Sequence, residues 1–184
     1  FDPRQAPVIR HDHHLPAVEA TRLSAQALRQ RFARPPEWQP EVVRERRFSA
    51  REPALAAVLL GIVLRAEPTV LLTQRTAHLS THSGQVALPG GKVDEEDDSV
   101  AATALREAQE EVGLDPKSVT VIAELPQLWL PPSRFKVTPV LAWWHAPHRL
   151  EAVNAHEVSA VHAVSIAEMV NPTNRVRVRT RSGF

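Results

Sequence analysis

The chain has 184 residues, which is enough for one domain with a substantial hydrophobic core. Its formal net charge of +1 at pH 7 gives no bulk attraction to nucleic acid or to a membrane surface, so neither is an expected partner. The sequence contains no cysteine, which excludes disulfides, thiolate catalysis and zinc sites built from cysteine. No apolar run reaches the roughly 18 residues that span a bilayer, and the lack of cysteine agrees with the cytoplasmic location that we expect.

Residues 1–50 are expected to form an N-terminal arm, ahead of a single domain over residues 51–184. Three histidines, His11, His13 and His14, lie close together in this arm. They either coordinate a metal ion or, as we favour because their flanks resemble loops, belong to a polar, mobile segment.

One short helix is predicted within the arm. Ser24 is suited to cap a helix over residues 25–32. Pro35 and Pro36 then end it, because a proline disfavours the helical conformation of the residue before it. The basic segment over residues 41–48 is either a solvated face or a screen for a phosphate-rich ligand, and the sequence leaves both interpretations open.

The main domain is predicted to combine strands with one packed helix. Residues 54–64 form a nearly unbroken apolar run, which is typical of a strand buried on both faces. Strands on both sides of the helix imply an α/β fold, in which helices pack against the faces of a mixed sheet. The other expected elements are strands at 69–74, 119–125, 135–144, 157–164 and 175–181, a loop at 126–134 and a short helix or turn at 166–170.

Residues 88–114 combine a glycine turn, a run of acidic residues and the packed helix. On that helix Glu107, Glu110 and Glu111 fall on one stripe, within about 100° of one another. Glu107 and Glu111 are a like-charged i,i+4 pair, which destabilises a helix by a few tenths of a kcal/mol. A divalent cation would remove this repulsion, because Mg²⁺ prefers carboxylate oxygens. The pattern indicates a metal site; the alternative is a solvated acidic face in which Glu110 pairs with Arg106.

The same stretch resembles the Nudix box, G-x5-E-x7-R-E-U-x-E-E-x-G-U, in which U is apolar. Gly90 and Gly91 provide the turn upstream, and Gly113 supplies the C-terminal stop of the helix. Counting back from Arg106, the first acidic position is Asp98, and Gly91 then lies one residue too far upstream. The positions that match in register are Arg106, Glu107, Ala108, Glu110, Glu111, Gly113 and Leu114.

The resemblance implies a Nudix-type α/β/α sandwich with a mixed β-sheet, and hydrolysis that depends on Mg²⁺ or Mn²⁺. Glu107 and Glu111 are then the principal metal ligands, with Glu110 as a third, directly or through water. By the family's pattern Arg106 orients a carboxylate of the box, and Asp98 is its expected partner.

Three further site residues follow from the resemblance. Nudix enzymes commonly place another glutamate near the start of a late strand, and Glu157 occupies such a position as a general base, a metal ligand or an ordinary surface residue. Backbone N–H groups of Gly90 and Gly91 can approach phosphates because no Cβ intervenes. Arg75 either contacts a substrate phosphate or pairs with a nearby acid.

The segment before the box resembles the signature of coenzyme A diphosphatases, L-L-T-x-R-[SA]-x3-R-x3-G-x3-F-P-G-G. Three positions depart from it: Thr76 for Ser or Ala, Ser80 for Arg, and Leu88 for Phe. The positions that agree are Leu71, Leu72, Thr73, Arg75, Gly84, Pro89, Gly90 and Gly91.

This second resemblance implies cleavage of coenzyme A into 4′-phosphopantetheine and adenosine 3′,5′-bisphosphate. The alternatives are a Nudix hydrolase for another diphosphate, such as ADP-ribose or a dinucleotide, and a binding module without catalysis. RNA binding through the arginines of residues 175–181 is disfavoured, because no aromatic residue is interleaved with them for base stacking. The sequence leaves the oligomeric state open.

Overall fold

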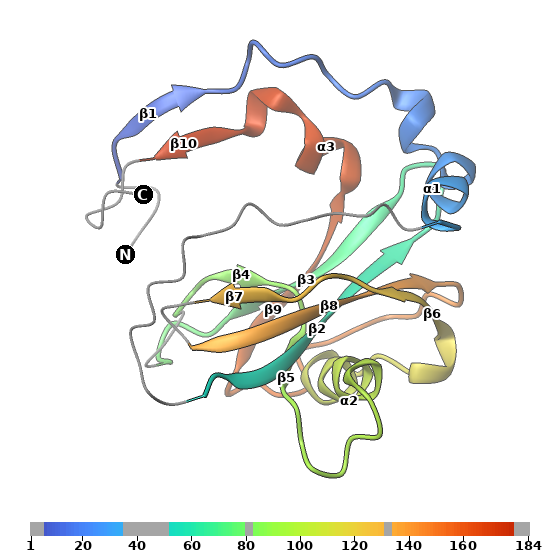
Figure 1. Cartoon of the computed structure of the whole chain (residues 1–184), viewed down its shortest axis with the longest axis vertical. Helices are drawn as coiled ribbons and strands as arrows, with labels where there is room; N and C mark the ends of the chain where they lie inside the picture. The colour runs from blue at the N-terminus through green and yellow to red at the C-terminus, as the bar shows by residue number, and fades with distance from the viewer. Residues whose placement is uncertain (1–5, 35–51, 80–82, 131–133, 179–184) are drawn as a thin grey trace.

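The computed structural model describes residues 6–34, 52–79, 83–130 and 134–178. Within these ranges eight strands form one mixed sheet (Figure 1). Its central order is β4-β3-β2-β8-β6, while β9 pairs with β3, β5 with β2 and β7 with β8. The strands are β2 (Ala54–Val63), β3 (Thr69–Arg75), β4 (Val86–Ala87), β5 (Gly90–Lys92), β6 (Val119–Glu124), β7 (Leu128–Leu130), β8 (Phe135–Trp144) and β9 (Val158–Ser165).

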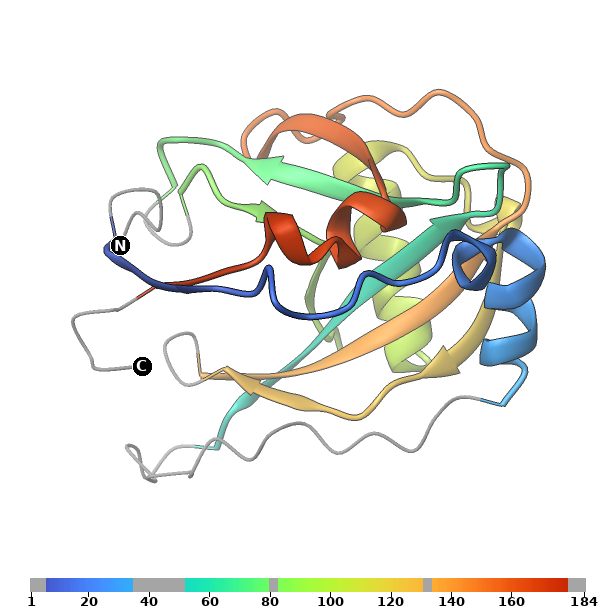
Figure 2. The same cartoon turned by 90° about the horizontal axis from the view of Figure 1, so that it is seen from above.

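The central strands β2 and β8 run parallel, and the other pairs of this sheet are antiparallel, so the predicted mixed α/β fold is confirmed. Helix α2 (Val100–Val112) packs on one face of the sheet (Figures 1 and 2). Residues of α1 (Ala25–Phe32) and α3 (Ile166–Val170) pack against a separate apolar cluster, built around Ile62, Val70 and Leu141.

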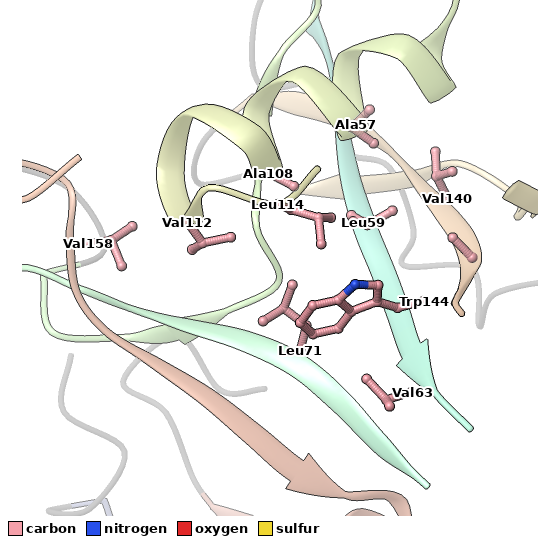
Figure 3. Close-up of a cluster of buried hydrophobic side chains, with 12 residues drawn as sticks. Ala57, Leu59, Val63, Leu71, Ala108, Val112, Leu114, Val140, Trp144 and Val158 are labelled. Atoms are coloured by element: carbon pink, nitrogen blue, oxygen red, sulfur yellow. The ribbon is translucent and has the colours of Figure 1, made fainter. Parts of the chain in front are cut away.

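The larger core lies between α2 and the sheet, and Figure 3 shows most of its side chains. Alternate residues of β2, such as Ala57 and Leu59, point to this face because successive side chains of a strand point to opposite faces. Ala104 and Ala108 of α2 are fully buried against them, and their small size lets the helix lie close to the sheet. This close packing also fixes the distance between the strands and the carboxylates on the neighbouring stripe of α2.

Helix α2 begins and ends at residues suited to those positions. The Oγ atom of Ser99 accepts a hydrogen bond from the backbone N–H of Ala102 at 3.1 Å. Gly113 has a φ of 71° and donates its N–H to the carbonyl oxygen of Gln109 at 2.9 Å. The predicted stop at Gly113 is confirmed. The same holds for the predicted cap of α1, where the N–H of Ala27 donates to Ser24 Oγ at 3.2 Å.

Two segments differ from the sequence prediction. Strand β7 lies within the expected loop 126–134 and pairs with the start of β8. Near the N-terminus, β1 (Val8–His11) pairs antiparallel with β10 (Val176–Val178), where a polar arm without structure was predicted (Figures 1 and 2). The arginines of 41–48 lie outside the described residues, as do those at 179 and 181.

The remaining described elements are short. They are η2 (Ala20–Leu23), η3 (Pro116–Ser118) and η4 (Pro172–Asn174), all of 3-10 type. The division at residue 50 stays a prediction. Within the described ranges, no helix combines the length and apolar character that a membrane span requires.

Candidate active site

The glutamates of α2 face the turn that contains β5. Glu111 is buried, with 4% of its surface exposed, and its Oε2 accepts a hydrogen bond from the backbone N–H of Gly90 at 3.3 Å. The side chain of Glu107 is 18% exposed, and its carboxylate occupies the space that a Cβ on Gly91 would need. Glu110, the residue before Glu111, is more exposed, with 56% of its side-chain surface accessible to solvent. The carboxylates of Glu107 and Glu111 thus lie directly against the backbone of Gly90 and Gly91.

The two glycines are required by this close approach. Gly90 has a φ of 155°, and a Cβ there would overlap the backbone of β2 at Ala57 and Val58. At Gly91 any side chain would displace the Glu107 carboxylate. Glycine at both positions therefore lets the turn lie between the sheet and the helix, with a backbone N–H directed at Glu111.

Burial, assisted by the nearby charges of Glu107 and Glu157, raises the pKa of Glu111 to about 7, although the hydrogen bond from Gly90 opposes this shift. The pKa of Glu107 is also raised, mainly by burial, although its hydrogen bond from Arg106 opposes this shift. Glu157 repels both helix carboxylates, and the positive charge of Arg75 lowers the pKa of Glu111. The structure therefore brings together the predicted site residues of four separate segments.

Arg75 is the last residue of β3, on the strand that pairs with β9. Its Nε atom is buried and finds no hydrogen-bond partner among the described residues. A buried guanidinium nitrogen without an acceptor is costly, and an anionic oxygen is the acceptor that suits it best. Arg75 is consequently suited to bind an anionic group of a ligand that lies next to the carboxylates.

The acidic partner of Arg106 is Asp97, and the prediction of Asp98 was wrong. Arg106 donates from Nε and Nη2 to the two carboxylate oxygens of Asp97, both at 2.9 Å. Its Nη1 donates to Glu107 at 3.0 Å and to Glu110 at 3.3 Å. Asp97 follows Gly91 by the six positions of the family pattern, so the extra residue of this chain lies after the acid and not before it.

Asp97 is itself held by three residues, two of them on α2 and one in the preceding loop. Besides Arg106, it accepts from Thr103 Oγ1 at 2.8 Å and from the backbone N–H of Asp94 at 2.9 Å. These hydrogen bonds, above all those from Arg106, hold the pKa of Asp97 well below its usual range. The shorter aspartate thus reaches Arg106 because the loop folds back on the first turn of α2. The spacing from Gly91 is the feature of the sequence that identifies Asp97 as this partner.

The donor set fits a hard divalent cation, because every candidate ligand is a carboxylate oxygen and a cation would offset the repulsion among Glu107, Glu111 and Glu157. Within the described ranges, no three acidic or histidine side chains already form a ligand shell. The carboxylates of Glu107 and Glu110 are turned toward Arg106 instead. Each uses a single oxygen in that contact, Oε1 of Glu107 and Oε2 of Glu110.

A family model of the NUDIX domain matches residues 55–181. The chain is 47% identical over 116 residues to the uncharacterized Nudix hydrolase NudL of Escherichia fergusonii, covering 63% of this chain and 59% of that protein. It is 48% identical over 113 residues to NudL of Salmonella paratyphi B, covering 61% and 58%. The chain thus spans about three-fifths of the length of these curated relatives.

Solved structures of lower identity share the fold. A C. elegans Ap4A hydrolase binary complex has a TM-score of 0.51 and 22% identity, over 62% of this chain and 84% of that one. A MutT protein from Methanosarcina mazei has a TM-score of 0.51 and 22% identity, over 66% and 83%. With the family model covering most of the domain and the box glutamates gathered on one helix, the chain belongs to the Nudix family.

Proposed function

We propose that the protein hydrolyses the diphosphate linkage of a nucleoside diphosphate derivative, and that this derivative is coenzyme A. The observation that carries the proposal is the juxtaposition of negative and positive groups around one turn. Glu107, Glu111 and Glu157 lie together, Gly90 donates a backbone N–H to Glu111, and the buried Nε of Arg75 is unpartnered among the described residues.

Glu107 and Glu111 would hold Mg²⁺ or Mn²⁺, with Glu110 as a third ligand directly or through water. When bound, such an ion polarises a phosphoryl oxygen and lowers the pKa of a water molecule. Arg106 keeps Glu107 and Glu110 on the same side of the helix through its hydrogen bonds. Glu157 is half-buried beside them, where it acts either as the general base that takes the proton of the attacking water or as an additional ligand.

Arg75 and the glycine turn supply the phosphate contacts of this proposal. A guanidinium presents several donors in a plane and matches the oxygens of a phosphate. Gly90 and Gly91 lie on the same turn, where the lack of a Cβ on Gly91 leaves room for the Glu107 carboxylate beside the backbone. The diphosphate would therefore lie between the end of β3 and the turn before α2.

The preference for coenzyme A rests on the signature before the box, from Leu71 to Gly91. The NudL relatives name no substrate. Two structures with this fold are titled for other ligands: the Ap4A hydrolase, and the Nudix domain of Shewanella oneidensis NrtR in complex with ADP-ribose, at 22% identity and a TM-score of 0.50. At that identity they share the fold alone, and they define the alternatives for an assay.

The test is a panel that compares coenzyme A, 3′-dephospho-coenzyme A, ADP-ribose and dinucleoside polyphosphates by kcat/KM. We expect coenzyme A to lead. One charged contact to its 3′-phosphate, at ~1.5–3 kcal/mol, would give it a roughly tenfold to hundredfold preference over the dephospho form. The Glu111→Gln variant, which keeps the shape of the side chain and removes its charge, is the inactive control.

Other results would change the conclusion in distinct ways. If ADP-ribose or a dinucleotide has the highest kcat/KM, the preference for coenzyme A is wrong and only the proposal of diphosphate hydrolysis remains. If no diphosphate is cleaved while one of them binds tightly, the chain is a binding module on a Nudix fold.

A further inference from the structure

Thr76, the residue after β3, is buried and holds the segment that leads to Glu157. Only 3% of its surface is exposed. Its Oγ1 donates to the carbonyl oxygen of His156 at 2.8 Å, and its backbone N–H donates to the carbonyl oxygen of Glu157 at 2.9 Å. The two consecutive carbonyls before β9 are thus both fixed to one residue at the end of β3.

The other side of this segment is fixed to the end of α2. The N–H of Glu151 donates to the carbonyl of Val112 at 3.3 Å, and the N–H of Val153 donates to the carbonyl of Glu111 at 3.0 Å. These carbonyls belong to the last turn of the helix, where carbonyl oxygens have no N–H partner within the helix itself. Residues 151–157 therefore bridge the C-terminal end of the metal-binding helix and the end of β3.

Beyond Glu157 the chain enters β9 through a bulge. Arg75 is paired with Val158 and Gln74 with Ala160, so Ser159 is an extra residue on β9. Its Oγ donates to the carbonyl of Gln74 at 3.1 Å. Bulges redirect neighbouring side chains and are frequent beside active sites. With Val158 buried in the core on one side and His156 held on the other, the backbone of Glu157 has little freedom.

We propose that Thr76 is a positioning residue, which fixes the backbone of residues 156–157 so that the carboxylate of Glu157 lies beside Glu107 and Glu111. The inference rests on the proposed function, in which Glu157 acts on the attacking water or as a ligand. Threonine suits the position because its β-branched side chain is stiff at χ1, which keeps the hydroxyl directed at His156. Serine would keep the donor with more freedom, and alanine would lose it.

Kinetics of Thr76→Val, Thr76→Ser and a control test the proposal. Valine keeps the shape and removes the hydrogen bond, so kcat should fall about tenfold to a hundredfold, as expected for a displaced catalytic group, while KM changes little. Thr76→Ser should recover most of the rate. Ser118→Ala is the matched control, because Ser118 is also buried and donates to a backbone carbonyl, that of Asp115 at 2.6 Å, on the segment that follows α2.

A double-mutant cycle separates positioning from a general loss of stability. If Thr76 acts through Glu157, adding Thr76→Val to Glu157→Gln should slow the enzyme no further. Rate losses that multiply fully in the double variant, or a wild-type kcat in Thr76→Val, would overturn the inference.

A readout without substrate keeps the inference distinct from the proposed function. Amide hydrogen exchange at Glu157 and Val158, whose N–H groups both donate to the carbonyl of Asn154, should become faster in Thr76→Val and stay unchanged in Ser118→Ala. If the wild-type protein cleaves no diphosphate, the proposed function fails while this exchange still reports the contact. Unchanged exchange in Thr76→Val would overturn the role of Thr76 whatever the activity.

Discussion

Burial of Glu111 makes the stability of the metal-free protein depend on pH. Its pKa is about 7 in the folded protein and about 4.5 for the free side chain. Between these values the folded state binds more protons than the unfolded state, so protonated Glu111 contributes stability that is complete below pH 4.5 and is lost as the pH rises to 7. The opposite dependence would apply to a carboxyl group whose pKa is lowered by folding.

We therefore predict that Glu111→Gln flattens this part of the pH profile. Relative to the variant, the wild-type protein should lose on the order of 3 kcal/mol of unfolding free energy between pH 4.5 and 8 in the presence of a chelator. Urea unfolding at several pH values measures the difference. Parallel profiles for the two proteins would show that the Glu111 carboxyl group is not buried as the structure has it.

The aspartate that anchors Arg106 is testable against its direct neighbour. Asp97 accepts two hydrogen bonds from Arg106, whereas Asp98 is exposed. Asp97→Asn should release the guanidinium and lower kcat, because Glu107 loses its fixed neighbour. Asp98→Asn should leave kcat and the melting temperature unchanged. Equal effects of the two substitutions on kcat would contradict the register that the structure assigns to the loop.

At the scale of the element, α2 combines a core face with a repulsive acidic face. If a cation binds to Glu107 and Glu111 as proposed, it should stabilise the folded state by mass action, by about 2.7 kcal/mol at a concentration of 100 Kd. For a chain of this size we predict a rise in Tm of roughly 5–10 °C on adding saturating Mg²⁺. Glu107→Gln should show a smaller rise, and an equal rise in both proteins would place the ion elsewhere.

The elements that sequence predicts best are those whose local signals agree. The apolar run of β8 was predicted from Phe135 to Trp144, and Ser24 and Gly113 marked helix ends that the structure confirms. β7 was missed because only three residues form it, between prolines, and its pairing with β8 depends on that strand. Strand β1 was missed for a related reason: its partner β10 lies about 165 residues away in the chain, and its exposed side chains show no core pattern.

The site was predictable in part. The box spacing places Glu107, Glu110 and Glu111 on one face of a helix, because helical periodicity alone decides that. Periodicity does not apply in a loop: counting back from Arg106 gave Asp98, whereas the spacing from Gly91 gives Asp97, the residue that the structure shows bound to Arg106 and Thr103. The contact of Thr76 with the segment before β9 joins residues 80 positions apart, and nothing in the local sequence reports it.

On the scale of the whole molecule, β1 and α1 are the parts of residues 6–34 whose contacts with the domain differ most in character. β1 and β10 form a two-stranded ribbon beside the main sheet, and all four residues of β1 are exposed (Figures 1 and 2). Helix α1 lies at the other end of this segment, where Phe32 packs edge-on against Trp143 with ring centroids 5.9 Å apart. Leu28 of the same helix is buried, with 6% of its surface exposed.

An isolated two-stranded ribbon is marginally stable in water, so we expect α1 and not the ribbon to hold this segment to the domain. Leu28→Ala should cost at least ~2 kcal/mol of unfolding free energy, because it removes buried methyl groups from a packed site. The corresponding fall in Tm is roughly 4–8 °C. Ile9→Ala, at a residue that is 54% exposed, should change the unfolding free energy by less than about 0.5 kcal/mol. Thermal unfolding of the two variants checks the comparison. A larger loss for Ile9→Ala would mean that the ribbon, and not α1, makes the larger contribution to the stability of this segment.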